Sequence, residues 1–317
     1  MNEKTINEKM ANEKTKVVLI GFDAWGAYSF PKANMPMAKR MAQNGSSAMN
    51  ARCVRPAKSS CNWASMMMGA GPDIHGYIDW DTAVPAFETP TDHYGIFPTI
   101  FALIKDQRPE LKIGYFYEWN LLHLFCPDAA AHHKEMMSGL SYDPGPAERI
   151  ADYIRRKKPD FTFIQFDEPD HRGHEAGHDT PPYYELLTQL DSFAAIIEKG
   201  VKDSGAYDNT IFILSADHGG IGKDHGGDTP MERNIPFIVF GKNIKKGYII
   251  QSQVMIYDIP ATIAYVFGVK TPQTWIGRPI TEIFNDDCNS NYELAGYGSA
   301  RRISGEAEAE VKAEVKI

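Results

Sequence analysis

The chain has 317 residues, a formal net charge of −8 and 43% hydrophobic residues, enough apolar content for one large α/β domain or two smaller ones. The acidic balance argues against a nucleic-acid polymer as partner, because such a partner needs clustered Lys and Arg. It leaves a small anionic substrate open, since bound metal ions can reverse the local field. No stretch is long and apolar enough to span a membrane.

Apolar, β-rich runs alternate with helical patterns along residues 16–285. The predicted strands are 17–22, 47–54, 112–118, 161–166, 210–216 and 235–241, and the predicted helices are 34–43, 61–69, 96–106, 146–157, 181–203 and 257–267. Several strands are continuously apolar, as in a parallel sheet covered on both faces. The alternation predicts a doubly wound α/β fold with a mostly parallel central sheet and helices on both faces. Asp258 is the predicted N-cap of the last helix.

Residues 77–145 are less regular than the rest, with aromatic side chains separated by Pro and Gly. We predict that this stretch is a small cap insertion over the active site, with one sheet strand inside it. Segments of this kind often carry substrate selection.

The chain ends and the cysteines give weaker indications. Residues 1–15 repeat Asn-Glu-Lys and lack the apolar core of a secretory signal, so we interpret them as a disordered leader, and residues 286–317 as a C-terminal tail. The cysteines, Cys53, Cys61, Cys126 and Cys288, form no CxxC pair and are too few for a disulfide framework. We therefore expect a cytoplasmic protein with free thiols, or a periplasmic or secreted one if a signal peptide has been removed. The sequence does not indicate the oligomeric state.

Acidic and histidine side chains follow three of the predicted strands. They are Asp23 after VVLIGF, Asp170 and His174 in EPDHRGH, Asp217 and His218 after IFILSA, and His225 in a second DHGG. Taken singly, each has a structural explanation as a helix cap, a solvated loop or a turn. In open α/β sheets, however, ligands bind beyond the carboxyl ends of the strands, so their shared placement favours a metal site. Imidazole with carboxylate suits Zn²⁺ better than Mg²⁺.

Ser59 lies in the sequence KSSCN, at the start of a predicted helix. A helix N-terminus offers backbone N–H groups and a favourable dipole to a phosphate. A serine hydroxyl becomes a good nucleophile when a metal ion lowers its pKa. The alternative is that Ser59 or Ser60 only caps the helix, and that Asn62 only packs in its first turn.

Four motifs together resemble the type I phosphodiesterase/nucleotide pyrophosphatase branch of the alkaline phosphatase superfamily. They are KSSCN (58–62), GAGPDIHG (69–76), EPDHRGH (168–174) and DHG (217–219). The resemblance implies two divalent ions, Zn²⁺ by preference and Mn²⁺ or Fe otherwise, with one held by Asp170, His174 and His225 and the other by Asp23, Asp217 and His218. It aligns Ser59 with a nucleophile that forms a phospho-serine, and Asn62 with an Asn that contacts phosphate. Lys58 and Trp80 are further predicted substrate contacts.

The resemblance has three departures: Ser59 replaces the branch's usual Thr, Ser60 replaces an aromatic residue, and His225 follows His218 very closely. The leading hypothesis is a metal-dependent phosphodiesterase, because Asn62 is a neutral amide where an Arg clamp would favour a phosphate monoester. Phosphomonoesterase, phosphonoacetate-type hydrolase and phosphomutase stay open. A sulfatase is disfavoured because neither Cys53 nor Cys61 lies in a formylglycine motif. A catalytically inactive metal-binding relative is disfavoured because no expected ligand is missing.

Overall fold

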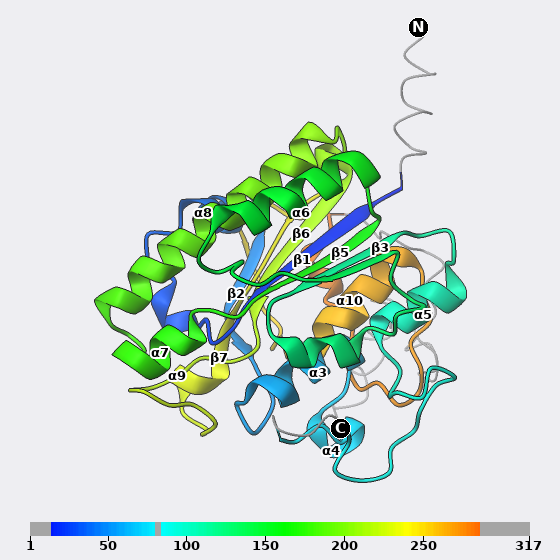
Figure 1. Ribbon diagram of the computed structural model, residues 1–317, viewed down its shortest axis with the longest axis horizontal. Helices are drawn as coiled ribbons and strands as arrows, with labels where there is room; N and C mark the ends of the chain where they lie inside the picture. The colour runs from blue at the N-terminus through cyan, green and yellow to red at the C-terminus, as the bar shows by residue number, and fades with distance from the viewer. Residues whose placement is uncertain (1–13, 80–83, 286–317) are drawn as a thin grey trace, which may run out of the picture.

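The computed structural model describes residues 14–79 and 84–285 (Figure 1). The N-terminal repeat up to residue 13, Trp80, Cys288 and the predicted tail lie outside these residues. One eight-stranded sheet has the order β4-β3-β5-β1-β6-β7-β2-β8. Its strands are β1 (Lys16–Phe22), β2 (Ser46–Arg52), β3 (Ile113–Tyr117), β4 (His133–Met136), β5 (Phe161–Phe166), β6 (Thr210–Ala216), β7 (Asn234–Gly241) and β8 (Tyr248–Ile249).

Helices cover both faces of this sheet. They are α2 (Pro36–Gln43), α3 (Ser59–Met68), α4 (Pro72–His75), α5 (Ile100–Gln107), α6 (Pro144–Lys157), α7 (Asp170–Ala176), α8 (Pro181–Asp203), α9 (Pro230–Arg233) and α10 (Asp258–Phe267). Short 3₁₀ turns are η1 (Ala27–Ser29), η2 (Asn120–Phe125), η3 (Tyr207–Asn209) and η4 (Thr281–Ile283). Figure 1 shows α6 and α8 on one face and α3, α5 and α10 on the other. The predicted doubly wound α/β fold is confirmed.

All six predicted strands are present, and β7 alone among the described strands runs antiparallel to its neighbours. The predicted helices are also present, with α5 starting four residues later than expected. The sequence analysis missed the edge strands β4 and β8 and the short helices α4, α7 and α9. Each of these has seven residues or fewer, which is too short for a periodic pattern to stand out.

The stretch expected to form a cap, 77–145, contributes more to the central domain than predicted. Its β3 and β4 extend the sheet beyond β5, and α5 packs against α3 and α10. Within the described part of this stretch, residues 77–79 and 84–99 have no regular secondary structure. Cys61 Sγ lies 3.2 Å from the carbonyl oxygen of Ile78, so this irregular segment begins beside the first turn of α3. That it covers the active site remains a prediction.

The register of the central strands places the site. Phe22, the last residue of β1, lies opposite Phe166 of β5 on one side and Ala216 of β6 on the other. All six residues of β5 and all seven of β6 are buried, as expected for strands covered on both faces. Because the three strands are parallel and end together, the residues that follow them meet at one edge of the sheet.

Two smaller predictions have different outcomes. Asp258 does not cap α10, because Tyr257 is the N-cap and Asp258 is the first helical residue. The carboxylate of Asp258 instead accepts backbone N–H bonds from Met255 and Arg278, so it joins the loops on either side of the helix. Cys53, Cys61 and Cys126 are buried free thiols, as expected.

Candidate active site

Three elements bring the predicted ligands to the carboxyl edge of the sheet. Asp23 follows β1, Asp217 and His218 follow β6, and Asp170 begins α7 just after β5. Ala24 has a positive φ of 55°, which a non-glycine residue rarely adopts. This turn lets the Ala24 N–H donate to Asp217 Oδ1 at 2.9 Å. The backbone after β1 is therefore fixed to the residue that ends β6.

Asp23, Asp217 and His218 form what we call the buried half-site. Their ligand atoms all lie within 4.8 Å of one another. His218 Nε2 is 3.6 Å from Asp23 Oδ1 and 3.3 Å from Asp217 Oδ2. The three residues are 2%, 0% and 0% exposed, so solvent does not reach this half of the centre directly.

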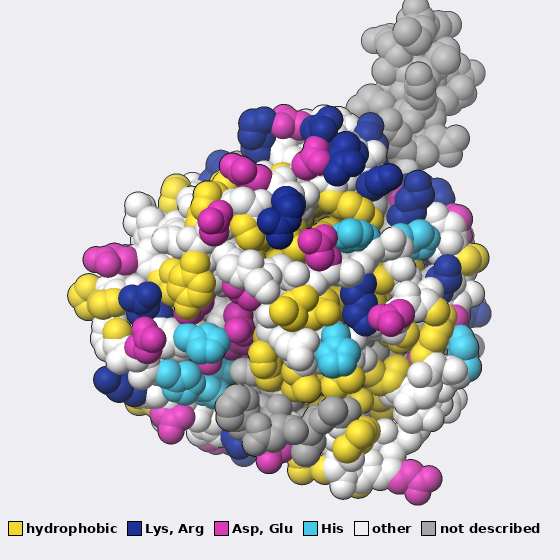
Figure 2. Space-filling view, in the orientation of Figure 1, with side chains coloured by type: hydrophobic (Ala, Val, Ile, Leu, Met, Phe, Trp, Pro, Cys, Tyr) yellow, Lys and Arg dark blue, Asp and Glu magenta, His cyan; other side chains and the backbone are white. Residues whose placement is uncertain are grey.

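We call the predicted set of Asp170, His174 and His225 the outer half-site, whereas the ligand atoms that lie within 4.8 Å of one another here are those of Asp170, His225 and His218. Asp170 Oδ2 lies 3.4 Å from His174 Nε2, and Asp170 Oδ1 lies 3.5 Å from His225 Nε2. The His225 ring is 5.0 Å from the His174 ring and stacks on His218 at 4.1 Å, centroid to centroid. Figure 2 shows histidine side chains reaching the surface beside α7, next to acidic ones. The two half-sites are thus in direct contact.

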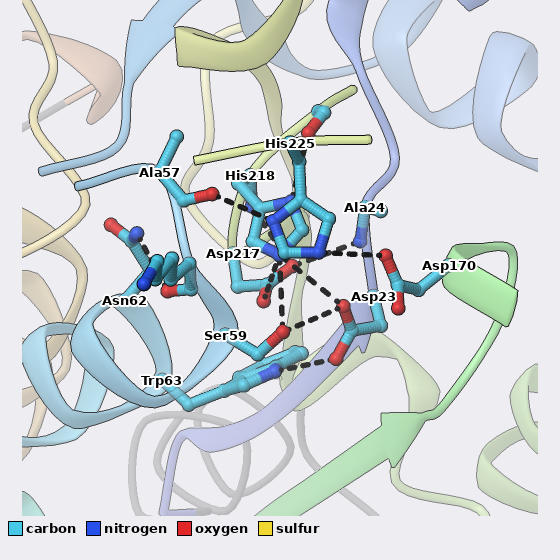
Figure 3. A network of polar contacts seen from close by, with 12 residues as sticks. Asp23, Ala24, Ala57, Ser59, Asn62, Trp63, Asp170, Asp217, His218 and His225 are labelled. Atoms are coloured by element: carbon cyan, nitrogen blue, oxygen red, sulfur yellow. Dashed lines mark hydrogen bonds and ion pairs between the residues drawn. The ribbon is translucent and has the colours of Figure 1, made fainter. Parts of the chain in front are cut away.

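Ser59 lies beside the buried half-site (Figure 3). Its Oγ is 3.4 Å from Asp23 Oδ1 and 3.1 Å from His218 Nε2. Ser59 is the first residue of α3, with Lys58 as the N-cap and no side-chain capping bond. Its hydroxyl is therefore not used to cap the helix. The first N–H groups of α3 have no intrahelical partner and can bind an anion beside the hydroxyl.

The three histidines are oriented in the same way. Nδ1 of His174 bonds to the Lys223 carbonyl, that of His218 to the Gly219 carbonyl and that of His225 to the Ala57 carbonyl, at 2.8–3.0 Å. A carbonyl oxygen only accepts, so each Nδ1 carries the proton and each Nε2 presents its lone pair to the centre. Metal-binding histidines are commonly held by such a second hydrogen bond.

Burial and neighbouring charges shift the pKa values of the site's carboxyl groups. Burial, together with the charges of Asp217 and Asp170, raises the pKa of Asp23 well above its usual value. Burial also raises the pKa of Asp217 to about 8, and it lowers that of His218 to about 3. Burial would raise the pKa of Asp170, but its histidine neighbours lower it overall. Such a concentration of buried acidic groups is stabilised by bound cations.

The residues present fit two divalent ions. Asp170 Oδ1 and Asp217 Oδ2 are buried and accept no hydrogen bond within the described part of the chain. Each belongs to a different half-site, and each faces the imidazole Nε2 atoms. Buried carboxylate oxygens need a partner, and a metal ion in each half-site would supply it. The mixed oxygen and nitrogen donors suit Zn²⁺.

Asn62 is bonded to the loop before α3 in this structure. Its Oδ1 accepts the Val54 N–H at 2.7 Å, and its Nδ2 donates to the carbonyls of Pro56 and Lys58. The side chain is fully buried and points away from Ser59 in Figure 3. In this arrangement both amide hydrogens and the carbonyl serve the loop before α3. Asn62 therefore supports the nucleophile loop, and its contact with phosphate stays a prediction.

The other predicted substrate contacts remain untested. Lys58 is half-buried, and its side-chain carbons run close to Gly226 in the loop that carries His225.

Three further histidines are not among the predicted ligands. His75 bonds to Ser65 and to the Tyr77 N–H, away from the ligand groups. His171 Nδ1 bonds to the Asp167 carbonyl. His178 is buried, and neither ring nitrogen has a partner among the described residues.

Sequence reasoning missed two kinds of contact. The Trp63 indole donates to Asp23 Oδ2 at 2.9 Å, and its spacing of four residues from Ser59 was the only available signal. The carbonyls that hold the histidines carry no sequence signal at all. Gly219, which follows His218, is required by close packing, because a side chain there would collide with the Met231 carbonyl.

Comparison with known proteins identifies the family. Residues 17–227, more than half of the chain, match the family model "Type I phosphodiesterase / nucleotide pyrophosphatase". The chain belongs to this family. Its members are hydrolases that act on phosphate esters. The ectonucleotide pyrophosphatase/phosphodiesterase family member 1 of Mus musculus is 23% identical over 201 residues, which cover 58% of this chain and 21% of that protein.

Solved structures share the fold. An inactive murine ectonucleotide pyrophosphatase/phosphodiesterase 5 in complex with AMP has a TM-score of 0.67 at 14% identity, covering 82% of this chain and 96% of that one. A putative sulfatase from Bacteroides thetaiotaomicron has a TM-score of 0.70 at 15% identity, covering 86% and 75%. At these identities the likeness shows the fold alone.

Two further findings concern the extent of the match and the helices. The first three curated relatives are matched over 17–24% of their own length, so this chain spans less than a quarter of each. Within residues 14–79 and 84–285, no helix combines the length and apolar character that a membrane span requires.

Proposed function

We propose that this chain is a two-metal phosphodiesterase in which Ser59 is the nucleophile and a phospho-serine is the intermediate. The observation that carries the proposal is the position of Ser59 Oγ, which lies within 3.4 Å of Asp23 and 3.1 Å of His218 at the N-terminus of α3. Zn²⁺ is the preferred ion, with Mn²⁺ or Fe as alternatives.

The two half-sites would hold one ion each. Asp23, Asp217 and His218 would bind the ion nearer to Ser59, and Asp170, His174 and His225 the other. When bound, the ions supply the positive charge that lowers the pKa of a hydroxyl and offsets the charge that develops on phosphoryl oxygens. His218 is neutral at pH 7 because burial lowers its pKa to about 3, so its Nε2 is ready to act as a ligand.

The protein's own residues then position the reaction. Ser59 Oγ forms a bond to phosphorus as the bond from phosphorus to the leaving oxygen breaks. The Ser59 proton passes to solvent, and the leaving oxygen takes up a proton from solvent and departs as an alcohol. The free N–H groups of the first turn of α3 bind a phosphoryl oxygen. Water then cleaves the bond between Oγ and phosphorus, which restores the Ser59 hydroxyl and releases the phosphate product.

A diester substrate is favoured because the two arginines that flank the nucleophile loop and the loop carrying His225 are paired with Asp228. Arg55 precedes the nucleophile loop and Arg233 follows the loop that carries His225, and both bind Asp228. Arg233 also donates to the Cys53 carbonyl. A phosphate monoester carries an extra negative charge that a guanidinium binds well. Because both arginines already bind Asp228, they are less available to bind the extra charge of a monoester. We therefore expect a singly charged diester to bind better.

Activity on two related esters tests the proposal. Metal-stripped and zinc-restored protein would be assayed with bis-p-nitrophenyl phosphate and p-nitrophenyl phosphate. We expect activity only after zinc is restored, and a higher kcat/KM for the diester. Equal activity without metal would contradict the metal requirement, and a preference for the monoester would contradict the substrate class. A phosphonate ester and a sulfate ester in the same panel test the remaining members of the superfamily.

A further inference from the structure

Trp63 joins the nucleophile helix to a predicted metal ligand. It lies one turn after Ser59 on α3 and is fully buried. Its Nε1–H donates to Asp23 Oδ2 at 2.9 Å, whereas Asp23 Oδ1 faces Ser59 Oγ and His218 Nε2. The two oxygens of one carboxylate therefore have separate partners (Figure 3).

The Trp63 ring has little freedom to move. A Cβ on Gly21 would lie 2.4 Å from the ring carbon Cη2, so the indole occupies space on β1 that only a glycine leaves open. On the other side the ring meets Phe163 of β5 edge-on, with centroids 6.1 Å apart. Packing in a dense core fixes a side chain in this way. The N–H is consequently held in one direction, toward Asp23.

We propose that Trp63 is a positioning residue that fixes the orientation of the Asp23 carboxylate, so that Oδ1 alone is offered to the metal ion beside Ser59. This inference rests on the proposed function. An indole N–H only donates, so it binds Oδ2 and leaves Oδ1 for the centre. Rotation of a carboxylate about its last side-chain bond is otherwise soft. Because Ser59 and Trp63 share α3, the same helix sets both the nucleophile and the ligand that it faces.

The test compares Trp63→Phe with a matched control, Trp275→Phe. Trp275 is also a buried indole, packs over a glycine, Gly69, and donates its N–H to the Pro98 carbonyl at 2.9 Å. Each substitution removes one buried indole N–H bond, but only Trp63 contacts a predicted ligand. Full-length wild type and both variants would be stripped of metal and titrated with Zn²⁺ against a chromogenic chelator, and Tm and steady-state kinetics would be recorded.

We expect Trp63→Phe to weaken one of the two zinc affinities by roughly 10- to 100-fold, the usual effect of losing a bond to a metal ligand. Its kcat should fall while KM stays close to the wild-type value. Trp275→Phe should lower Tm without changing either zinc affinity. If Trp63→Phe behaves like Trp275→Phe, with a lower Tm but both zinc affinities and kcat intact, Trp63 only packs and the inference is wrong.

A second variant covers the case in which Trp63→Phe fails to fold. Benzothienylalanine at position 63 keeps the bicyclic shape and replaces the N–H with sulfur, so it removes the donor alone. Full zinc affinity in that protein would overturn the inference. Wild-type protein shows whether the proposed function itself is wrong. If wild type binds no zinc, the proposed function and the role of Trp63 are both wrong. If wild type binds two zinc ions and turns over substrate, the variants alone decide the role of Trp63.

Discussion

The two halves of the candidate active site use the same kinds of side chain, but different parts of the fold build them. The buried half-site consists of residues at the ends of β1 and β6, which are 0–2% exposed. The outer half-site comes from the seven-residue helix α7 and the glycine-rich loop after β6, and the His174 side chain is 42% exposed.

This difference determines how each half is held. In the buried half-site, parallel strand register fixes the ligands, and Asp217 Oδ1 binds the backbone of Ala24 and His218. In the outer half-site, single hydrogen bonds from His174 to the Lys223 carbonyl and from His225 to the Ala57 carbonyl do this work. We therefore expect the ion of the buried half-site to be held rigidly, and the ion of the outer half-site to exchange more readily because a surface loop holds it.

Ser59, which contacts the buried half-site through Asp23 and His218, should give the largest effect. Ser59→Ala removes the nucleophile, so kcat should fall by roughly 10⁴-fold or more, while two zinc ions stay bound. Ser60→Ala is the matched control, because the neighbouring Ser60 hydroxyl is buried and has no hydrogen-bond partner in the described structure. Steady-state kinetics and metal analysis measure both properties. Turnover retained in Ser59→Ala would rule out the covalent mechanism.

Removing one ligand from each half should separate the two ions. His174→Ala should lower the affinity for the outer ion only, and Asp217→Asn the affinity for the buried ion only. Each affinity should fall by more than about 100-fold, which exceeds the usual effect of losing a hydrogen bond to a metal ligand. A chelator should also strip the outer ion first from wild type. Competition titrations and stopped-flow chelation measure these effects. Loss of both ions together in His174→Ala would show that the halves are not independent.

In the metal-free protein, Asp217 should contribute less stability as pH rises. Burial raises the pKa of Asp217 to about 8, above an unfolded value near 3.9. At this carboxyl the folded state therefore holds more protons between about pH 4 and pH 8, and the contribution of Asp217 to the free energy of unfolding falls across that window. Asp217→Asn keeps an oxygen for the two backbone N–H groups but cannot ionise. Its Tm should depend less on pH than that of the metal-free wild type, and parallel Tm profiles would contradict this assignment.

The sheet and the placement of the ligands followed from the sequence. Long apolar runs identified β1, β5 and β6, and their shared direction brought Asp23, Asp170 and Asp217 to one edge. This worked because parallel strands in a covered sheet have few alternative arrangements. The family followed from the motif spacing, which the match over residues 17–227 confirms.

What the sequence did not predict depends on the path of short loops. Asn62 is turned inward because the loop from Val54 to Lys58 folds back on it. Trp63 reaches Asp23 because Gly21 leaves room on β1. Residue types and spacing predict neither the path of a short loop nor the room left beside a strand. The contacts that support the site therefore became visible only in the three-dimensional structure.

Anomalous diffraction from crystals of the zinc-restored protein tests the central claim most directly. The account predicts two zinc peaks, one among Asp23, Asp217 and His218 and the other among Asp170, His174 and His225, with Ser59 Oγ adjacent to the first. A single peak, or zinc bound away from Ser59, would contradict it.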